Sequence, residues 1–298
     1  MTDEFYMRRC LQLAENGMQN AKPNPMVGAV IVCEGRIIGE GYHVRCGEAH
    51  AEVNAFASVR PADEHLLTAS TLYVSLEPCS HYGKTPPCAD LIISKGIKRV
   101  VVGCLDPFEK VSGRGVQKLR DAGIDVAVGI LEKECLHLNR RFITNVVKKR
   151  PFITLKWAQS SDGFIDRNYK QEQFSTPYSQ MLVHKLRSEN DAILVGNVTE
   201  QREHPQLNVR YWSGKSPRKI VLSHEHPLDL SKLYDEGVHT LLVEGGRQTL
   251  QWFIDNNLYD EVRVEVADKE VQSGTKAPAY PTEGREVTGY GLQVTGTS

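Results

Sequence analysis

Four side chains between positions 50 and 88 have the types and the order needed to hold a metal ion and use it. His50 is followed two residues later by Glu52, and Cys79 and Cys88 come after the next apolar segment. One imidazole and two thiolates make three protein ligands for zinc. They leave the fourth tetrahedral position open for water, as in a catalytic site. Glu52 would move protons at that water, so these residues predict hydrolytic chemistry.

The pattern His-x-Glu followed by Pro-Cys-x-x-Cys is a signature of zinc nucleobase deaminases. His50-Ala51-Glu52 and Pro78-Cys79 match it, but eight residues instead of two separate Cys79 from Cys88. The predicted reaction is hydrolytic deamination of an amidine-like carbon in a pyrimidine or purine ring, because a carboxylate can pass a proton to the leaving amine. The alternative is a closed structural zinc site, with a fourth ligand from one of three other residues: His43, Cys46 or His81.

The composition excludes several classes of protein. The 298 residues are enough for two domains of roughly 100–200 residues each. A hydrophobic content of 40% and a charged content of 24% are typical of soluble globular proteins. The formal net charge of −1 gives no positive field for nucleic acid or an anionic membrane. An aromatic content of 7% also argues against a nucleic-acid deaminase, which needs a basic track and exposed aromatic rings.

The termini and the cysteines predict a cytoplasmic protein. The first five residues lack the basic start and apolar core of a signal peptide, and no apolar run approaches the ~20 residues of a membrane span. There are seven cysteines, an odd number that indicates reduced thiols in the cytosol. We therefore expect neither a membrane nor a nucleic-acid partner.

The elements that position the four side chains follow from the apolar pattern. The first half alternates predicted strands and helices, which implies a sheet covered by helices. Helices that begin near His50 and Cys88 place both ligands at helix starts, where the helix dipole favours a thiolate. In chain order we predict a helix at 3–21, strands at 27–32 and 36–43, a helix at 50–59, a strand at 71–76, a helix at 88–95, a strand at 99–105, a helix at 115–122 and a strand at 124–130.

The alternation restarts after a charged segment that ends in Pro151. A helix at 131–147 leads to this segment, which we take as the boundary between domains of residues 1–148 and 151–298. Both are predicted to be α/β domains. The second has predicted strands at 152–157, 191–196, 218–222, 240–244, 261–266 and 287–295, with helices at 176–188 and 247–256.

Five motifs in the first half occur together: the segments 24–28, 41–43, 50–52 and 77–88, and Asp106-Pro107. In this combination the chain resembles the bifunctional deaminase/reductase family of riboflavin biosynthesis. The long insertion between Cys79 and Cys88 is the discriminating mark, since cytidine and tRNA adenosine deaminases usually have two residues there.

This resemblance implies a cytidine-deaminase-like, three-layer N-terminal domain. It would deaminate a diaminohydroxy-(phosphoribosylamino)pyrimidine. By the same resemblance, His50, Cys79 and Cys88 bind zinc and Glu52 transfers protons. The resemblance also implies that two further residues lie near the pyrimidine, Asn24 and His43.

The second half carries further motifs of the same family in the expected order, at 150–156, 161–163, 186–187, 192–196, 205–210 and 243–246. They are similar to its reductase domain, which has a fold like that of dihydrofolate reductase. The implied reaction is hydride transfer from NADPH, which opens a ribosyl ring to a ribityl chain. The resemblance implies an NADPH site of Ala158, Gln173, Ser175, Thr199, Glu203 and Gly245, and a substrate site of Arg187, Leu207, Arg210 and Glu244.

Physical arguments support parts of this assignment. Arginine suits a substrate phosphate because its guanidinium forms bidentate, charge-assisted hydrogen bonds. Glu244-Gly245-Gly246 lies between a predicted strand and a predicted helix, where glycines let backbone N–H groups approach a phosphate. A plain turn has the same pattern, and no GxGxxG fingerprint is present.

The chain also departs from the family pattern. Glu203 stands where the family commonly has Asp, and Gln173 where an aromatic residue is common. The interval 222–241 is too short for the strand and helix that usually occupy it. We therefore predict a bifunctional enzyme, with two alternatives. One is a deaminase whose C-terminal domain is a non-catalytic nucleotide-sensing or assembly module, and the other is a zinc-stabilised scaffold without activity. The resemblance further implies a homodimer or a higher homo-oligomer.

Overall fold

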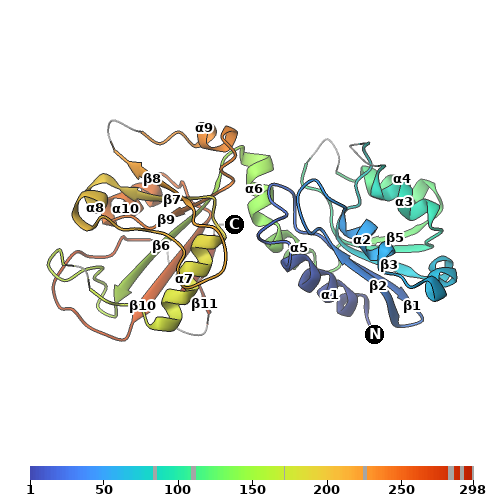
Figure 1. The fold of residues 1–298 in the computed structure, drawn as a ribbon, viewed down its shortest axis with the longest axis horizontal. Helices are drawn as coiled ribbons and strands as arrows, with labels where there is room; N and C mark the ends of the chain where they lie inside the picture. Colours follow the sequence, from blue (N-terminus) through green and yellow to red (C-terminus); the bar gives the residue numbers. More distant parts are fainter. Residues whose placement is uncertain are drawn as a thin grey trace. The chain divides into compact units, whose positions relative to one another are not determined.

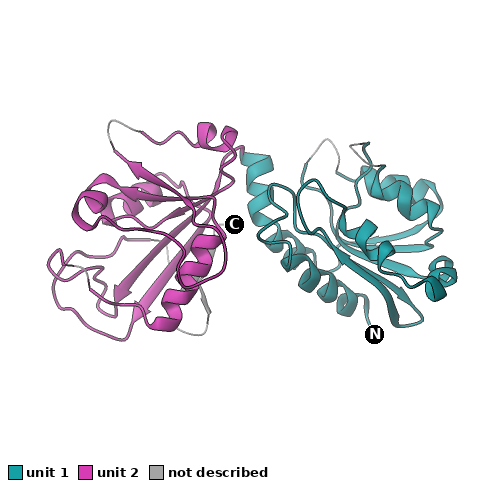
Figure 2. Ribbon diagram, viewed as in Figure 1, with its two compact units in different colours: residues 1–148 teal, residues 149–298 magenta. Residues whose placement is uncertain are grey.

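The computed structural model divides into two compact units, residues 1–148 and 149–298 (Figure 2). It describes residues 1–82, 86–108, 112–170, 172–223, 227–280, 285–288 and 292–296. The division falls in the charged segment before Pro151. Within the described ranges, no helix has both the length and the apolar character that a membrane crossing requires.

A five-stranded mixed sheet organises the first unit (Figure 1). Its strand order is β2-β1-β3-β4-β5. Strand β1 pairs antiparallel with both β2 and β3, whereas β3, β4 and β5 are parallel. The carboxyl ends of β3 and β4 therefore lie at the same edge of the sheet. The bounds are β1 Gly28–Cys33, β2 Arg36–Tyr42, β3 Thr71–Leu76, β4 Arg99–Cys104 and β5 Asp125–Val128.

Helices cover both faces of this sheet, because every residue of β1 is buried and its side chains alternate between two cores. Ala29 and Ile31 pack with helices α2 (Ala51–Ala57), α3 (Cys88–Ser94) and α4 (Arg114–Asp121). Val30 and Val32 pack with α1 (Asp3–Glu15) and α5 (Glu132–Leu138) on the other face. The first unit is thus a three-layer α/β/α structure, as expected.

A seven-stranded sheet forms the second unit, in the order β11-β12-β10-β6-β9-β7-β8 (Figure 1). The five strands from β10 to β8 are parallel, and the hairpin β11–β12 adds an antiparallel edge. The bounds are β6 Phe152–Ser160, β7 Ala192–Gly196, β8 Arg218–Leu222, β9 Thr240–Val243, β10 Glu261–Ala267, β11 Arg285–Thr288 and β12 Leu292–Gly296.

Helices also lie on both faces of the second sheet. Helices α9 (Leu230–Asp235) and α10 (Arg247–Asp255) pack on one face through Leu233, Leu250 and Phe253. Helix α7 (Pro177–Ser188) packs on the other through Leu186, beside Ile193 and Leu242. Thr176 caps α7 by accepting the backbone N–H of Ser179.

Several predicted bounds differ from the structure. The helix predicted at 131–147 is two helices, α5 and α6 (Arg140–Lys148), which meet at Asn139. The Asn139 side chain bonds the backbone N–H and C=O of Met26, 2.8 and 2.9 Å away. The first helix ends at Glu15 instead of residue 21. The pattern missed a 3₁₀ helix (η1, Pro61–Ala69) and helix α8 (Asn197–Glu203).

The short interval after β8 holds helix α9 and, in its described part, no further strand. Residues 224–226 of this interval lie outside the described ranges, as do residues 83–85 of the Cys79–Cys88 insertion. The strand predicted at 287–295 is the hairpin of β11 and β12, whose residues 289–291 are likewise not described.

Candidate active sites

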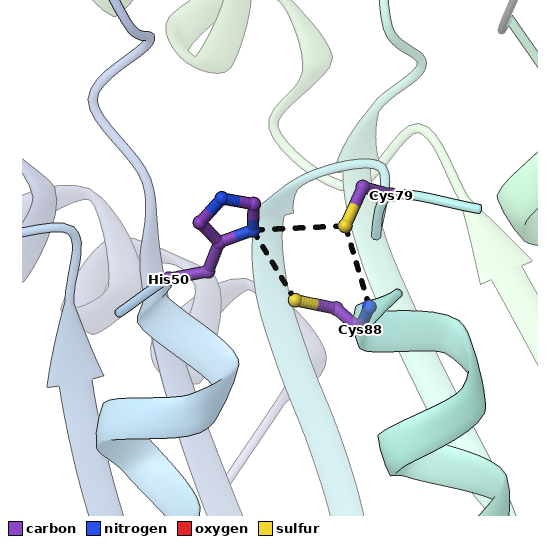
Figure 3. A group of neighbouring side chains, drawn as sticks. All are labelled: His50, Cys79 and Cys88. Atoms are coloured by element: carbon purple, nitrogen blue, oxygen red, sulfur yellow. Dashed lines mark hydrogen bonds between the residues drawn. The ribbon is translucent and has the colours of Figure 1, made fainter. Parts of the chain in front are cut away.

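The three predicted zinc ligands converge from three segments (Figure 3). His50 is the residue before α2, Cys79 lies in the segment after β3, and Cys88 begins α3. Nδ1 of His50 is 3.6 Å from Sγ of Cys79 and 3.3 Å from Sγ of Cys88, and all three ligand atoms lie within 4.8 Å of one another. A tetrahedral zinc with bonds of about 2.0–2.3 Å needs ligand atoms roughly 3.3–3.8 Å apart. The donor set therefore fits zinc.

The surroundings of the two sulfurs favour a thiolate. Sγ of Cys79 accepts the backbone N–H of Cys88 at 3.3 Å, where α3 begins. The Cys88 thiol hydrogen-bonds the same sulfur and, with His50, lowers the pKa of Cys79 to about 4. The pKa of Cys88 rises, because it keeps the proton of the pair. The site thus supplies a thiolate readily, and thiolate is the form that binds metal.

None of the three proposed fourth ligands joins the cluster in the described part of the chain. Cys46 and His81 are exposed. Both ring nitrogens of His43 are engaged, with Nδ1 3.1 Å from the carbonyl oxygen of Ala49 and Nε2 3.1 Å from Nδ2 of Asn24. A carbonyl only accepts, so Nδ1 donates and Nε2 accepts from the amide. These contacts favour the open, catalytic type of zinc site.

Glu52 lies in the first turn of α2, with its side chain almost completely buried. Burial raises its pKa to about 7. A carboxyl group that titrates near neutral pH can both take up and release a proton. Gly41 lets α2 pack closely against β2, since a Cβ at position 41 would stand 2.3 Å from the backbone N of Ala55. This contact fixes the helix that carries Glu52.

The ring of His43 packs edge-on against that of His50, with centroids 5.6 Å apart. Through its hydrogen bond to His43, Asn24 reaches the same place from the loop before β1. The structure therefore brings together all six residues predicted for the deaminase site.

Glu77 is a buried carboxylate that the sequence prediction did not include. It directly precedes Pro78-Cys79, and its oxygens accept four backbone N–H groups. Its position next to Pro78-Cys79 was the only sign in the sequence that it belongs to the site. A sequence pattern does not show which groups surround a carboxylate in the fold.

In the second unit the structure gathers three of the four predicted substrate residues. Arg187 on α7 forms a bidentate ion pair with Glu244, at 3.1 and 2.6 Å, and also donates to the backbone oxygen of Asn208 at 3.3 Å. Arg210, two residues after Asn208 in the chain, is exposed. The side chain of Leu207 is buried in the core beside Leu186, so only its backbone is available to a ligand.

His184 contacts the segment that carries Arg210, and the sequence prediction did not include it. Its Nδ1 accepts the backbone N–H of Arg210 at 2.9 Å, and its ring packs edge-on against Tyr211. Burial, together with the charges of Arg187 and Arg210, lowers the pKa of His184. The neutral ring is thus a fixed acceptor for the segment that carries Arg210.

The predicted NADPH residues lie mainly in two local groups. Oγ of Ser175 donates to Glu265 at 2.6 Å, Glu265 pairs with Ala158 across the sheet, and the Gln173 amide donates to the backbone oxygen of Ser175. In the second group, Oγ1 of Thr199 accepts the N–H of Gly246, next to Gly245. Glu203 is the exposed last residue of α8.

These positions fit a dinucleotide. Strands β6, β7, β9 and β10 are parallel, so their carboxyl ends share one edge, where ligands bind in such sheets. A Cβ on Gly245 would stand 2.5 Å from Cα of Val195. Only glycine lets the ends of β7 and β9 approach so closely. Helix α10 begins just beyond and directs backbone N–H groups to this edge, which suits a phosphate.

Comparison with known proteins decides the family. The family model described as the cytidine and deoxycytidylate deaminase zinc-binding region matches residues 1–104, and that of the RibD C-terminal domain matches 151–231 and 225–275. The riboflavin biosynthesis protein RibD of Aquifex aeolicus is 39% identical over 319 aligned positions, covering 91% of this chain and 88% of that protein. The chain belongs to the RibD family. It is thus a bifunctional deaminase and reductase of riboflavin biosynthesis that depends on zinc and NADPH.

Other RibD relatives agree. The Escherichia coli protein is 45% identical over 214 residues, which cover 72% of this chain and 57% of that protein. A crystal structure from Thermotoga maritima, described as a diaminohydroxyphosphoribosylaminopyrimidine deaminase/5-amino-6-(5-phosphoribosylamino)uracil reductase, matches with a TM-score of 0.86 at 35% identity. The match covers 98% of this chain and 97% of that one. These matches confirm the predicted family, the two-domain α/β fold class and both activities. The two segments of the RibD C-terminal match meet at 225–231, inside the interval that the sequence showed to be short.

Proposed function

We propose that residues 1–148 deaminate 2,5-diamino-6-(ribosylamino)pyrimidinone 5′-phosphate and that residues 151–298 then reduce the ribosyl group to a ribityl chain with NADPH. The observation that supports this most directly is the three-ligand cluster of His50, Cys79 and Cys88, whose Cys88 side chain contacts the buried carboxyl group of Glu52. The Thermotoga maritima relative, named for the corresponding deaminase and reductase reactions, supports the choice of substrates.

For deamination, we assign the metal to the cluster and proton transfer to Glu52. Zinc, when bound, supplies a water whose pKa is lowered to about 7. The carboxylate of Glu52 accepts a proton and delivers it to the leaving amine, and the burial of its side chain keeps it titratable near neutral pH. The amide of Asn24, oriented by its bond to His43, faces the pyrimidine and presents its oxygen to a ring N–H or amine.

For reduction, we assign the phosphate of the substrate to Arg210. Arg210 is exposed, its guanidinium donates to the amide oxygen of Gln206 at 2.6 Å, and the bond to His184 fixes its backbone. Glu244, which Arg187 keeps ionised, and the backbone near Leu207 complete the substrate side. We place NADPH along Ala158, Gln173, Ser175, Thr199, Glu203 and Gly245, at the carboxyl edge of the parallel strands.

A parallel assay tests the proposal. The full-length protein is given the pyrimidine substrate, zinc and NADPH, and ammonia release and NADPH absorbance are followed together. We expect ammonia release first, and NADPH oxidation only after the deaminated product forms. Ammonia release without NADPH oxidation would instead support the alternative of a non-catalytic C-terminal domain.

We further propose that the enzyme acts in the cytoplasm as a homo-oligomer. None of the seven cysteines forms a disulfide, as expected in a reducing compartment. The family resemblance supports a dimer, and light scattering on the purified protein measures its mass directly. A mass of one chain, 33.4 kDa, would contradict the dimer.

A further inference from the structure

Glu77 is a buried anion that is bound only by backbone amides among its described contacts. In the sequence it lies between β3 and the ligand Cys79, and it is nearly inaccessible to solvent. Oε1 accepts N–H groups from Gly115 at 2.8 Å and Val116 at 3.2 Å. Oε2 accepts those of Asp106 at 3.1 Å and Gly113 at 2.9 Å. A buried carboxylate is costly unless it is fully hydrogen-bonded, and four amide donors meet that need.

These four bonds join three segments of the first unit. Glu77 belongs to the segment that leads to Cys79, Asp106 follows β4, and Gly113 and Gly115 lie at the start of α4. The backbone N–H of Glu77 also donates to the carbonyl oxygen of Cys104, 3.0 Å away. The carboxylate therefore serves as the N-terminal cap of α4, supplied from another part of the chain.

The start of α4 is pressed against the peptide that carries the metal ligand. A Cβ on Gly115 would lie 2.0 Å from the carbonyl oxygen of Pro78, so only glycine permits this contact. The carbonyl group of Pro78 and the carboxylate of Glu77 thus both contact the first turn of α4. The direction of the chain at Cys79, and with it the place of Sγ, follows from this contact.

We propose that Glu77 is a positioning residue of the deaminase site, which fixes the Cys79 ligand and the adjoining 105–108 segment before metal or substrate binds. It touches neither the metal ligands' donor atoms nor, in our assignment, the substrate. It acts by keeping the backbone on which Cys79 is carried in one geometry. The inference rests on the proposed deaminase function of this unit.

The variant Glu77→Gln tests this in the full-length protein. Glutamine has nearly the same shape, but its NH₂ group would face two backbone N–H donors, so two of the four bonds are lost. We expect zinc affinity, measured by competition with a chromogenic chelator, to fall on the order of tenfold or more. We expect kcat for ammonia release at saturating zinc to fall as well. Reductase activity with the deaminated substrate should stay at the wild-type value, because the second unit has its own cores. Circular dichroism and the thermal transition of the variant show whether the first unit has folded.

Asp63→Asn is the matched control. Asp63 is as buried as Glu77 and lies in the same unit, but its carboxylate binds the guanidinium groups of Arg36 and Arg60. Arg36 is at the turn end of the β1–β2 hairpin, whereas β2 leads to His43 at its other end. This variant should lose thermal stability and keep both zinc affinity and kcat.

Two results would overturn the proposal. One is a Glu77→Gln protein with wild-type zinc affinity and wild-type deaminase kcat, whatever its melting temperature. If that variant does not fold, Glu77→Asp is measured in the same way. The shorter carboxylate of Asp cannot reach all four amides. Wild-type zinc affinity in the Glu77→Asp protein is therefore the second result that would overturn the proposal. A wild-type protein that releases no ammonia would refute the proposed function instead, and the zinc affinities would still decide the role of Glu77.

Discussion

At the scale of single residues, the proposed deaminase site depends on one buried carboxyl group. Glu52 is nearly fully buried, and burial is the main cause of its raised pKa. His43 has a different role, because Nδ1 contacts the carbonyl oxygen of Ala49 and Nε2 contacts the amide of Asn24. The first residue is suited to moving a proton and the second to holding Asn24 in place.

We predict that Glu52→Gln retains zinc and stops ammonia release, since an amide cannot accept the proton. Metal analysis and an ammonia assay of the same sample check both parts. Glu48→Gln changes an exposed acid close in sequence and should have no effect. Deamination by Glu52→Gln at a near wild-type rate would show that another group moves the proton.

A second prediction concerns the substrate phosphate. Arg210→Ala should raise KM in the reductase assay by roughly tenfold or more, because a charge-assisted hydrogen bond contributes about 1.5–3 kcal/mol. Arg218→Ala, which removes an exposed arginine paired with Glu236, is the control and should leave KM unchanged. If Arg210→Ala also leaves KM unchanged, Arg210 does not bind the phosphate.

At the scale of elements, an ion pair that is largely shielded from water joins α7 to Glu244, the residue after β9. Only 13% of the Arg187 side chain and 9% of the Glu244 side chain are exposed. Removal of one partner leaves a buried charge without its counterion, which typically costs about 3–5 kcal/mol. Loss of either partner should therefore destabilise the second unit as well as alter its predicted substrate site.

Arg187→Ala should accordingly lower the thermal stability of the second unit, by far more than Arg218→Ala does. The exposed pair of Arg218 and Glu236 contributes at most about 1 kcal/mol. Differential scanning calorimetry of both variants provides the comparison. Equal melting temperatures would mean that the Arg187–Glu244 pair contributes nothing to stability.

The contact between α7 and the 205–210 segment predicts a pH dependence. The folded protein disfavours protonation of His184, through burial and the charges of Arg187 and Arg210, which Glu244 partly offsets. Because the unfolded chain takes up this proton near pH 6.5, the stabilisation is present above about pH 6.5 and is lost as the pH falls below it.

His184→Asn should reduce this dependence, since an amide oxygen accepts the Arg210 N–H without titrating. Urea unfolding of wild type and variant at about pH 7.5 and 5.5 spans the histidine transition. If the free energy of unfolding falls equally in both proteins, His184 is not the group responsible.

At the scale of the whole molecule, each activity has its own sheet and its own hydrophobic cores. The clusters around β1 and β3 contain residues of the first unit only, and those around β6 and β9 contain residues of the second. Neither proposed site needs a residue from the other unit. Loss of one site should therefore leave the other intact.

Zinc removal tests this separation. Dialysis against a chelator should abolish ammonia release while NADPH oxidation with the deaminated substrate continues at its former rate. Restoring zinc should restore ammonia release. A parallel loss of the reductase activity would show that the two units are coupled through the metal site.

The sequence by itself predicted most strands, and it predicted the three candidate zinc ligands that the structure brings together, with Glu52 as the candidate proton carrier. Strands and helices follow from local apolar periodicity, and the ligands from residue type and spacing near predicted helix starts, so neither needs the rest of the fold. Helix α8 was missed because none of its residues is buried, and it therefore shows no apolar pattern. The two-helix arrangement of α5 and α6 was missed because it depends on the contact of Asn139 with Met26, 113 positions away.

Only the tertiary structure showed that the cluster has no fourth ligand among the described residues, that Arg187 pairs with Glu244, and that the Leu207 side chain lies in the core. It also revealed the four amides around Glu77. Each of these depends on which groups from distant segments surround a side chain. Residue type states what a side chain can bind, whereas packing decides which of those partners is within reach.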